Sequence, residues 1–272
     1  MLLAIDVGNT NVMLGVFDDG KLVERWRLTT DPVRTADEYG TLVLQLFEYD
    51  NIDRTKIDDI IIATVVPSVL FALQHMSIKY FEINPFIVET GIKTGLSVQC
   101  DDPRQIGSDR IVNSVAAHTK YEGTLIVIDF GTATTISVVT DEGEFIGGTI
   151  APGLKISAKA LFEETAKLPH VELETPSKTI GKNTIESMQS GLVYGHMGMT
   201  ERIVAGIKKE LVSVYGKKLE DIKVIATGGM ASMMEEGVEC IDYIDKMLTI
   251  EGLAIIYKKN IKSRVNKRVQ GE

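Results

Sequence analysis

The sequence has little cysteine, little histidine and no long apolar run. Two cysteines in 272 residues, Cys100 and Cys240, provide neither a disulfide framework nor a metal-ligand spacing, so a reducing compartment is expected. No window approaches 18 uninterrupted apolar residues, which excludes a transmembrane helix. The first residues include Asp6 and lack a basic segment, so no signal peptide is expected. We therefore expect a soluble, cytoplasmic protein that does not bind a membrane.

Positive charge is also scarce. The chain has 29 Lys and Arg against 38 Asp and Glu, a net charge of −9. Nucleic-acid binding usually needs a basic face, so nucleic acid is not an expected partner. Small anionic substrates remain open, because they need only a local positive site. The hydrophobic content of 44% is typical of a globular protein, and 272 residues predict one large or two modest domains.

A weak internal repeat is the most informative feature along the chain. The segment Leu2–Val23 aligns with Leu125–Ile146 at an offset of 123 residues without a gap. Each copy has an apolar strand, an Asp-x-Gly turn, a second strand, an acidic-Gly turn and a third strand. Alternating α/β material follows each copy. The repeat predicts an α/β fold of two duplicated ribonuclease H-like (actin-like ATPase) lobes with a nucleotide cleft between them.

The repeat also predicts where the lobes begin and end. We expect the first lobe at residues 1–118 and the second at residues 119–260. The second lobe would include a final helix over Thr249–Lys259. Residues 261–272 form a charged tail, which we expect to be solvated.

Two copies of an Asp-x-Gly turn, Asp6–Asn11 and Asp129–Thr135, are candidates for phosphate binding. A carboxylate at the end of a buried strand is costly unless it is paired or close to a metal. Glycine lets backbone N–H groups approach phosphate oxygens closely. A plain hairpin turn would use the same residue types, but their repetition favours a nucleotide site. Two carboxylates beside phosphates would also require cations.

A second motif, Gly107–Arg110, lies at the expected start of a helix. Ser108 is a good N-cap, and Asp109 in the first turn gains from the helix dipole. Arg110 lies at the unfavourable end of that dipole, which suits a bidentate contact with a carboxylate. An Asp beside an anion-binding Arg suits a general base for a substrate hydroxyl.

Weaker signals lie elsewhere. Thr184 precedes a helix and is expected to cap it, and Gly228-Gly229 after the strand Lys223–Thr227 suits close approach of an adenine ring. The four histidines have no metal or triad spacing and are expected to be structural. A Gly-x4-Gly-Lys-[Ser/Thr] loop and a Ser-centred nucleophile elbow are both missing, which disfavours phosphate-loop and hydrolase functions.

The sequence resembles the type III pantothenate kinases. The resemblance rests on motifs that run in order across nearly the whole chain. They are Asp6–Thr10, Arg34–Tyr39, Gly107–Arg110, Asp129–Thr134, Gly147–Gly153, Ile180–Thr184 and Ala226–Gly229.

The resemblance implies ATP-dependent phosphorylation of pantothenate to 4'-phosphopantothenate, the first step of coenzyme A biosynthesis. It implies Mg²⁺ or another divalent cation at Asp6, K⁺ or NH4⁺ at Asp129, and a homodimer. The implied ATP-binding residues are Asp6, Val7, Gly8, Asn9, Thr10, Asn11, Val12, Met13 and Thr132.

The resemblance also implies an acceptor site with Asp109 as the catalytic base. The implied pantothenate-binding residues are Gly107, Ser108, Asp109, Arg110 and Thr184. Cys100 stands where the family commonly has a substrate-contacting Tyr, which puts that contact in question. Two alternatives remain: a regulatory accessory protein of the same fold, or a kinase or phosphatase acting on sugars, acetate or polyphosphate. ATP consumption with pantothenate against a panel of those acceptors would separate them.

Overall fold

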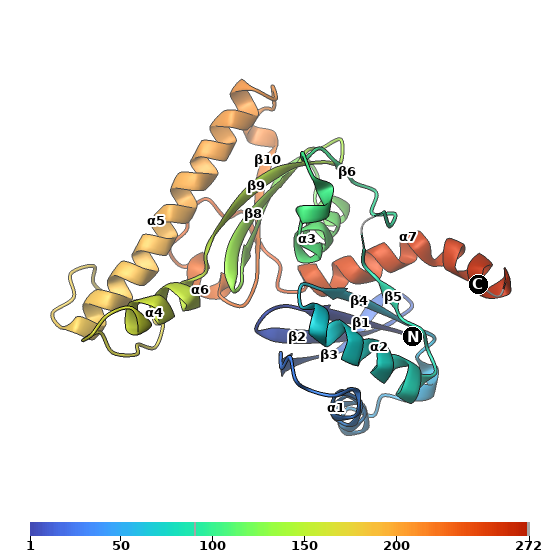
Figure 1. Ribbon diagram of the computed structural model, residues 1–272. Coiled ribbons are helices and arrows are strands. Elements are labelled where there is room, and N and C mark those ends of the chain that lie inside the picture. Colours follow the sequence, from blue (N-terminus) through green and yellow to red (C-terminus); the bar gives the residue numbers. More distant parts are fainter. Residues whose placement is uncertain (90, 271–272) are drawn as a thin grey trace. The chain divides into compact units, whose positions relative to one another are not determined.

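The computed structural model describes residues 1–89 and 91–270, with side chains through Ile261. These residues form two compact units (Figure 1). The first contains Met1–Ser97, Asp101–Ala116 and the segment from Met247 onwards, and the second contains Val98–Cys100 and Ala117–Lys246. Within the described part of the chain, no helix is both long enough and apolar enough to cross a membrane.

The first unit is built on a five-stranded sheet with the order β3-β2-β1-β4-β5. β1 pairs antiparallel with β2 and parallel with β4, so it lies in the middle of the sheet. This position explains its almost wholly apolar sequence, because a central strand is covered on both faces. The strands are β1 (Leu2–Val7), β2 (Asn11–Asp18), β3 (Lys21–Thr29), β4 (Asp59–Thr64) and β5 (Phe86–Ile87).

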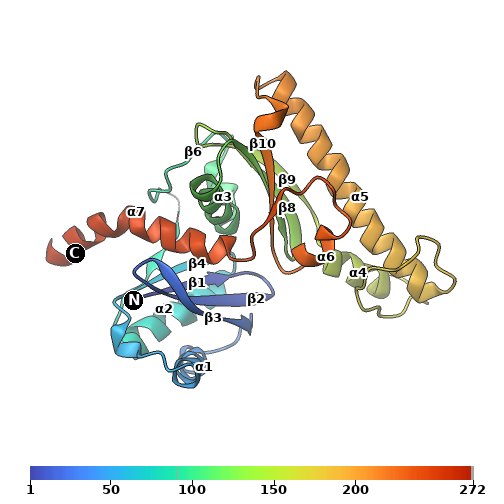
Figure 2. The same ribbon diagram turned by 180° about the vertical axis from the view of Figure 1, so that it is seen from behind.

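Helices cover both faces of the first sheet. One apolar cluster joins the sheet to α1 (Ala36–Tyr49) and α2 (Pro67–Phe81). A second cluster joins the opposite face to α3 (Ser108–Lys120) and α7 (Leu248–Gln270). Figures 1 and 2 show α1 and α2 on one side of this sheet and α7 on the other. Two short 3₁₀ helices complete this part: η1 (Arg54–Lys56) and η2 (Pro103–Gln105).

The second unit is built on a six-stranded sheet with the order β11-β10-β7-β8-β9-β6. One face packs against the 30-residue helix α5, with α4 and α6 in the same apolar cluster (Figure 2). The strands are β6 (Ser97–Val98), β7 (Thr124–Phe130), β8 (Ala133–Val139), β9 (Glu144–Pro152), β10 (Ile222–Thr227) and β11 (Tyr243–Ile244). The helices are α4 (Leu154–Glu163), α5 (Thr184–Ser213), α6 (Ala231–Glu235) and the 3₁₀ helix η3 (Leu219–Asp221).

The two sheets repeat one topology. β9-β8-β7-β10-β11 has the same order and strand directions as β3-β2-β1-β4-β5. This confirms two duplicated ribonuclease H-like lobes, as the Asp-x-Gly repeat predicted. The ungapped offset of 123 residues is wrong across the second strand, however. Val7 pairs with Val12 and Phe130 pairs with Thr134, and the bulge at Val16 recurs at Val138, which gives an offset of 122.

The last helix differs from the expected boundaries. We had placed Thr249–Lys259 in the second lobe, but α7 runs through Leu248–Gln270 and groups with the first. Its apolar residues Ile250, Leu253 and Ile256 lie in one cluster with the β1 and β4 side chains. The backbone of the expected tail is therefore helical to Gln270, and residues 271–272 lie outside the described residues.

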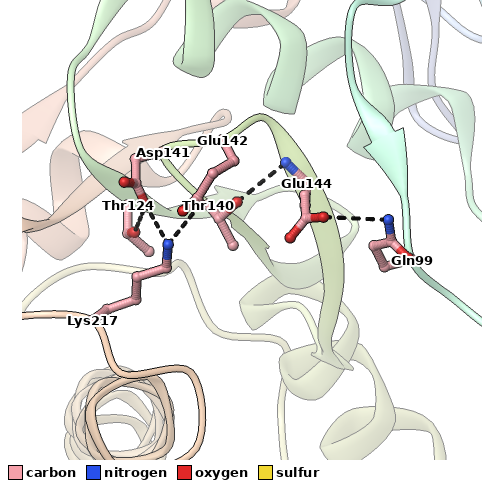
Figure 3. Close-up of polar contacts among 7 residues, drawn as sticks. All are labelled: Gln99, Thr124, Thr140, Asp141, Glu142, Glu144 and Lys217. Atoms are coloured by element: carbon pink, nitrogen blue, oxygen red, sulfur yellow. Dashed lines mark hydrogen bonds and ion pairs between the residues drawn. The ribbon is translucent and has the colours of Figure 1, made fainter.

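A lysine fixes one end of the second sheet (Figure 3). Lys217 Nζ lies 2.6 Å from a carboxylate oxygen of both Asp141 and Glu142 in the β8–β9 turn. Thr124, at the start of β7, also donates its hydroxyl to Asp141 at 3.0 Å. The Lys217 ammonium, helped by the Thr124 hydroxyl, lowers the pKa of Asp141 to about 2. This cluster ties the turn to the start of β7, the end opposite Asp129.

Candidate active site

The candidate site in the first lobe begins at the turn between β1 and β2. Gly8 N donates to Asn11 O at 3.0 Å, which closes the turn. Thr30 Oγ1 donates to Gly8 O at 2.7 Å and holds the turn from the side of β3. Asp6 is half-buried beside Ala63 of β4, whereas Asn9 is exposed. The turn thus presents polar side chains and backbone at the carboxyl end of a buried strand.

The start of α3 lies at the same edge of the first sheet. Val65 N, just after β4, donates to Val7 O at 3.0 Å, and Ser108 Oγ donates to Thr64 O at 3.1 Å. The expected N-cap role of Ser108 is therefore wrong. The Gly107 carbonyl accepts the first helical hydrogen bonds, and the Ser108 hydroxyl anchors the helix start to β4.

Glycine determines where the Asp109 carboxylate lies. Asp109 is half-buried, and its Oδ1 accepts a hydrogen bond from Arg110 N at 2.9 Å. A Cβ at Gly107 would lie only 2.4 Å from the same Oδ1, so a larger residue would displace the carboxylate. The first lobe thus brings the Asp6–Asn11 turn and the Gly107–Arg110 helix start to the carboxyl ends of β1 and β4. Ligands of open α/β sheets bind outside such strand ends.

The second-lobe candidate is the turn after β7. Gly131 N donates to Ala133 O at 3.1 Å, and Gly153 N donates to Thr132 O at 3.1 Å. Gly228 has φ +96°, and a Cβ there would lie 2.4 Å from Asp129 Oδ1. A Cβ at Gly131 would lie 3.2 Å from the same atom. Two glycines therefore leave space around the Asp129 carboxylate that side chains would fill.

The expected cations would each have a single protein carboxylate, Asp6 or Asp129, as a ligand. In the described part of the chain, no group of three His, Cys, Asp or Glu side chains could hold a metal by itself. Mg²⁺ at nucleotide sites usually has one or two protein carboxylates, with phosphates and water as its other ligands. A single carboxylate at Asp6 fits that pattern. The carboxylate of Asp129, which lies close to the glycines Gly131 and Gly228, is an oxygen ligand of the kind that a monovalent cation needs.

Thr184 lies elsewhere on the second lobe. Asn183, and not Thr184, is the N-cap of α5, because Asn183 Oδ1 accepts from Glu186 N at 2.9 Å. Thr184 is exposed and lines an open cavity of about 610 Å³ between α4 and α5. Leu161, Leu168, Met188 and Leu192 form an apolar part of its wall.

Cys100 also belongs to the second unit. Gln99 N donates to Phe145 O at 2.9 Å, which attaches this segment to β9. The half-buried Cys100 faces the glycine pair of that strand, and its Sγ lies 4.0 Å from where a Gly147 Cβ would be.

Two lobes of this topology, each with an Asp-x-Gly turn at the end of its first strand, define the two-lobed actin-like fold. A family model described as type III pantothenate kinase matches residues 2–206. The chain belongs to that family, and its activity is the ATP-dependent phosphorylation of pantothenate in coenzyme A biosynthesis.

Solved structures share the fold at low identity. A Campylobacter jejuni protein described as a conserved Baf family transcriptional activator is 19% identical, with a TM-score of 0.58 over 96% of this chain and 99% of that one. A reductive activator for a corrinoid, iron–sulfur protein is 11% identical, with a TM-score of 0.50 over 98% of this chain and 62% of that one. At these identities the similarity shows the fold alone.

Sequence reasoning missed two residues of this region. Gly228 was read as a place for adenine, and its closeness to Asp129 depends on how β10 and β7 pair. His196 is expected from the sequence to be structural, and its ring shares a 2.8 Å hydrogen bond with Thr134 at the second Asp-x-Gly turn. A lone His in a long helix carries no motif that would have indicated this contact.

Proposed function

We propose that Asp109 is the general base that accepts the proton of the pantothenate hydroxyl attacking the γ-phosphorus of ATP. One observation carries this proposal: the Asp6–Asn11 turn and the start of α3 share one edge of the first sheet. Hydrogen bonds from Val65 to Val7 and from Ser108 to Thr64 support that arrangement. A base held by Gly107 and by Arg110 N needs little reorganisation when the proton is transferred.

We assign ATP binding to two turns, one in each lobe. The closed turn at Gly8 and its exposed Asn9 support contacts with phosphate oxygens. Thr132, held by Gly153 N, is the corresponding contact in the second lobe. The full proposed set in the first lobe is Asp6, Val7, Gly8, Asn9, Thr10, Asn11, Val12 and Met13.

We assign a divalent cation, Mg²⁺ or another, to Asp6 and a monovalent cation, K⁺ or NH4⁺, to Asp129. Bound cations would neutralise the negative charge that develops on the transferred phosphoryl group. The half-burial of Asp6 and the space left by Gly131 and Gly228 support these assignments.

The pantothenate contacts are proposed from both motif and position. Arg110 would bind the carboxylate of pantothenate, because a guanidinium matches a carboxylate with two parallel hydrogen bonds. Gly107 and Ser108 belong to the same helix start, and Thr184 lines the cavity beside α5. Cys100 would replace an aromatic hydroxyl contact with a smaller, weaker donor.

The oligomeric state, the compartment and the kinds of partner are also proposals. We propose a homodimer in the cytoplasm, where ATP is available and two free cysteines stay reduced. No nucleic-acid or membrane partner is proposed, given the net charge of −9. The regulatory alternative draws only on a shared fold, at 19% identity to a protein described as a transcriptional activator.

ADP release with pantothenate, sugars and acetate as acceptors tests the activity and the base together. Pantothenate alone should support turnover, and Asp109→Asn should lower kcat by roughly 10²-fold or more without weakening ATP binding. Asp101→Asn, an exposed carboxylate in the segment before α3, is the control and should behave as wild type. Normal turnover by Asp109→Asn would leave this carboxylate with a structural role only.

A further inference from the structure

The duplicated lobes differ at one buried position next to the phosphate turn. In the first lobe, Val7 and Val12 pair at the base of the turn, and both are buried in an apolar cluster. In the second lobe, Phe130 and Thr134 form the equivalent pair. Thr134 is 1% exposed, yet it is polar. The first lobe therefore shows that an apolar residue at this position is enough to form the hairpin.

His196 of α5 is the partner that makes a polar residue possible there. Its Nε2 and Thr134 Oγ1 share a 2.8 Å hydrogen bond in the core, where the histidine is 7% exposed. The same ring lies 6.1 Å from the Phe130 ring, at 56°. One imidazole thus contacts both residues that flank the turn Gly131–Ala133.

The protonation state of the ring suits a fixed hydrogen bond. Burial lowers the pKa of His196, so the imidazole is neutral near pH 7. A neutral imidazole has one donor and one acceptor nitrogen, and a threonine hydroxyl can match either. The His196 backbone is held as well, because its carbonyl accepts a hydrogen bond from Thr200 Oγ1 at 2.9 Å.

Stability alone does not explain the pair. Replacing both partners of a buried hydrogen bond with apolar groups of similar shape is often nearly neutral for stability. A hydrogen bond adds direction, however, since it weakens steeply when the donor and acceptor move out of line. It fixes the start of β8 against α5, at the residue that follows the turn carrying Thr132.

We propose that His196 is a positioning residue that orients the Thr132 turn for nucleotide through its hydrogen bond to Thr134. This inference rests on the proposed role of Thr132 in ATP binding. The expected effect of His196 is on the binding of the nucleotide and not on the binding of the acceptor. Thr184 lies twelve residues earlier on α5, about 18 Å along a helix that rises about 1.5 Å per residue.

Four variants of the full chain separate positioning from packing. His196→Leu and Thr134→Val each remove the hydrogen bond, and the double variant recreates the apolar arrangement of the first lobe. His196→Gln is the conservative variant, since its amide can reach the Thr134 hydroxyl. For each protein we would measure ATP affinity by calorimetry, KM for ATP and for pantothenate, kcat and the melting temperature.

Each single apolar variant should weaken ATP binding by about 3- to 10-fold, the range of one net hydrogen bond. The KM for pantothenate should stay within about twofold of wild type. The double variant should regain the melting temperature of wild type but not its ATP affinity, and His196→Gln should regain most of that affinity. Recovery of ATP affinity together with melting temperature in the double variant would overturn the proposal, because His196 would then serve packing alone.

A different experimental result would refute the proposed function. Wild-type protein that binds ATP but releases no ADP with pantothenate would refute the proposed acceptor chemistry. The ATP affinities of the four variants would still decide the role of His196. Wild-type protein that does not bind ATP would overturn both proposals.

Discussion

Glycine fixes the position of both carboxylates that matter most in the candidate site. Gly107 leaves room for Asp109, and Gly228 leaves room for Asp129, each by the absence of a single Cβ atom. The proposed roles of these residues can be tested with single substitutions. A nearby glycine or a nearby charged residue then serves as the control position.

Gly228→Ala should impair the monovalent-cation site proposed at Asp129. The new Cβ would lie 2.4 Å from Asp129 Oδ1 and 2.7 Å from Phe130 N, and φ +96° is unfavourable for alanine. We expect the K⁺ concentration for half-maximal activity to rise by about tenfold, the effect of about 1.4 kcal/mol. Gly229→Ala is the matched control, since nothing lies within 4 Å of its Cβ position. Equal K⁺ dependence in the two variants would argue against a cation at Asp129.

Arg110→Ala should discriminate between pantothenate and an analogue whose carboxylate is a neutral amide. Loss of a hydrogen bond to a charged group costs about 1.5–3 kcal/mol, and only the acid forms one. The measurement is kcat/KM for acid and amide, in wild type and variant. Arg104→Ala, whose side chain is 79% exposed beside Asp102, is the control. An equal loss for both substrates would show that Arg110 acts on Asp109 or on the phosphates.

At the scale of elements, the sequence predicts strands and helices better than their ends. The repeat indicated three strands in each lobe, and the sheets have them. The first turn of the second copy is shorter by one residue, and its next turn, Asp141–Gly143, is longer by one than Asp19-Gly20. The two changes cancel in the total spacing, so an ungapped alignment could not detect them.

The sequence also could not predict which residue caps α5 or which sheet α7 covers, because both depend on the path of the chain in space. Asn183 and Thr184 can each cap a helix, and the path of the chain decides which one does. The spacing of Ile250 and Leu253 indicates an apolar helix face, but it does not say which sheet that face covers. The contact between His196 and Thr134 joins residues 62 positions apart, and it becomes visible only when α5 is packed on the second sheet.

Lys217→Met should make stability less sensitive to acid. A lowered pKa of about 2 means that Asp141 contributes stability above its ordinary value near 3.8, and that this contribution is lost as pH falls towards 2. Lys217 has a raised pKa, so its contribution is lost only in strong alkali. Because Asp141 is 51% exposed, we expect at most about 1 kcal/mol.

Urea unfolding from pH 7 to pH 2.5 measures this difference. The gap between wild type and Lys217→Met should be constant down to about pH 5 and shrink below about pH 4. Lys218→Met, an exposed neighbour, should follow wild type throughout. A gap that persists at the lowest pH would show that packing of the lysine stem, and not its charge, holds the turn.

At the scale of the whole molecule, the first lobe uses both ends of the described chain. Leu253→Ala in α7 should therefore destabilise a lobe whose strands lie some two hundred residues earlier. Leu253 is fully buried in the cluster with Leu2 and Ala4, and such truncations cost about 2–5 kcal/mol.

The single tryptophan, Trp26 in β3, reports on this lobe because its ring packs on Phe47 at 5.4 Å. Urea unfolding followed by Trp26 fluorescence should show a lower midpoint for Leu253→Ala. Lys258→Ala, exposed on the same helix, should leave that midpoint within the usual surface range. An unchanged Trp26 midpoint in Leu253→Ala would place the stabilising role of α7 outside the first lobe.

The position of α7 also sets the order in which the nascent chain can fold. Synthesis proceeds at about 5–20 residues per second, so α7 leaves the ribosome roughly 10–30 s after β5. During that interval the apolar face of the first sheet that includes Leu2, Ala4 and Ile61 has α3 but lacks α7, the second helix that covers it. The second lobe, continuous from Ala117 to Lys246, has by then been fully synthesised. The lobe whose synthesis begins first is therefore the lobe that is completed last, and the part of its sheet that α7 covers stays exposed until the last helix has been made.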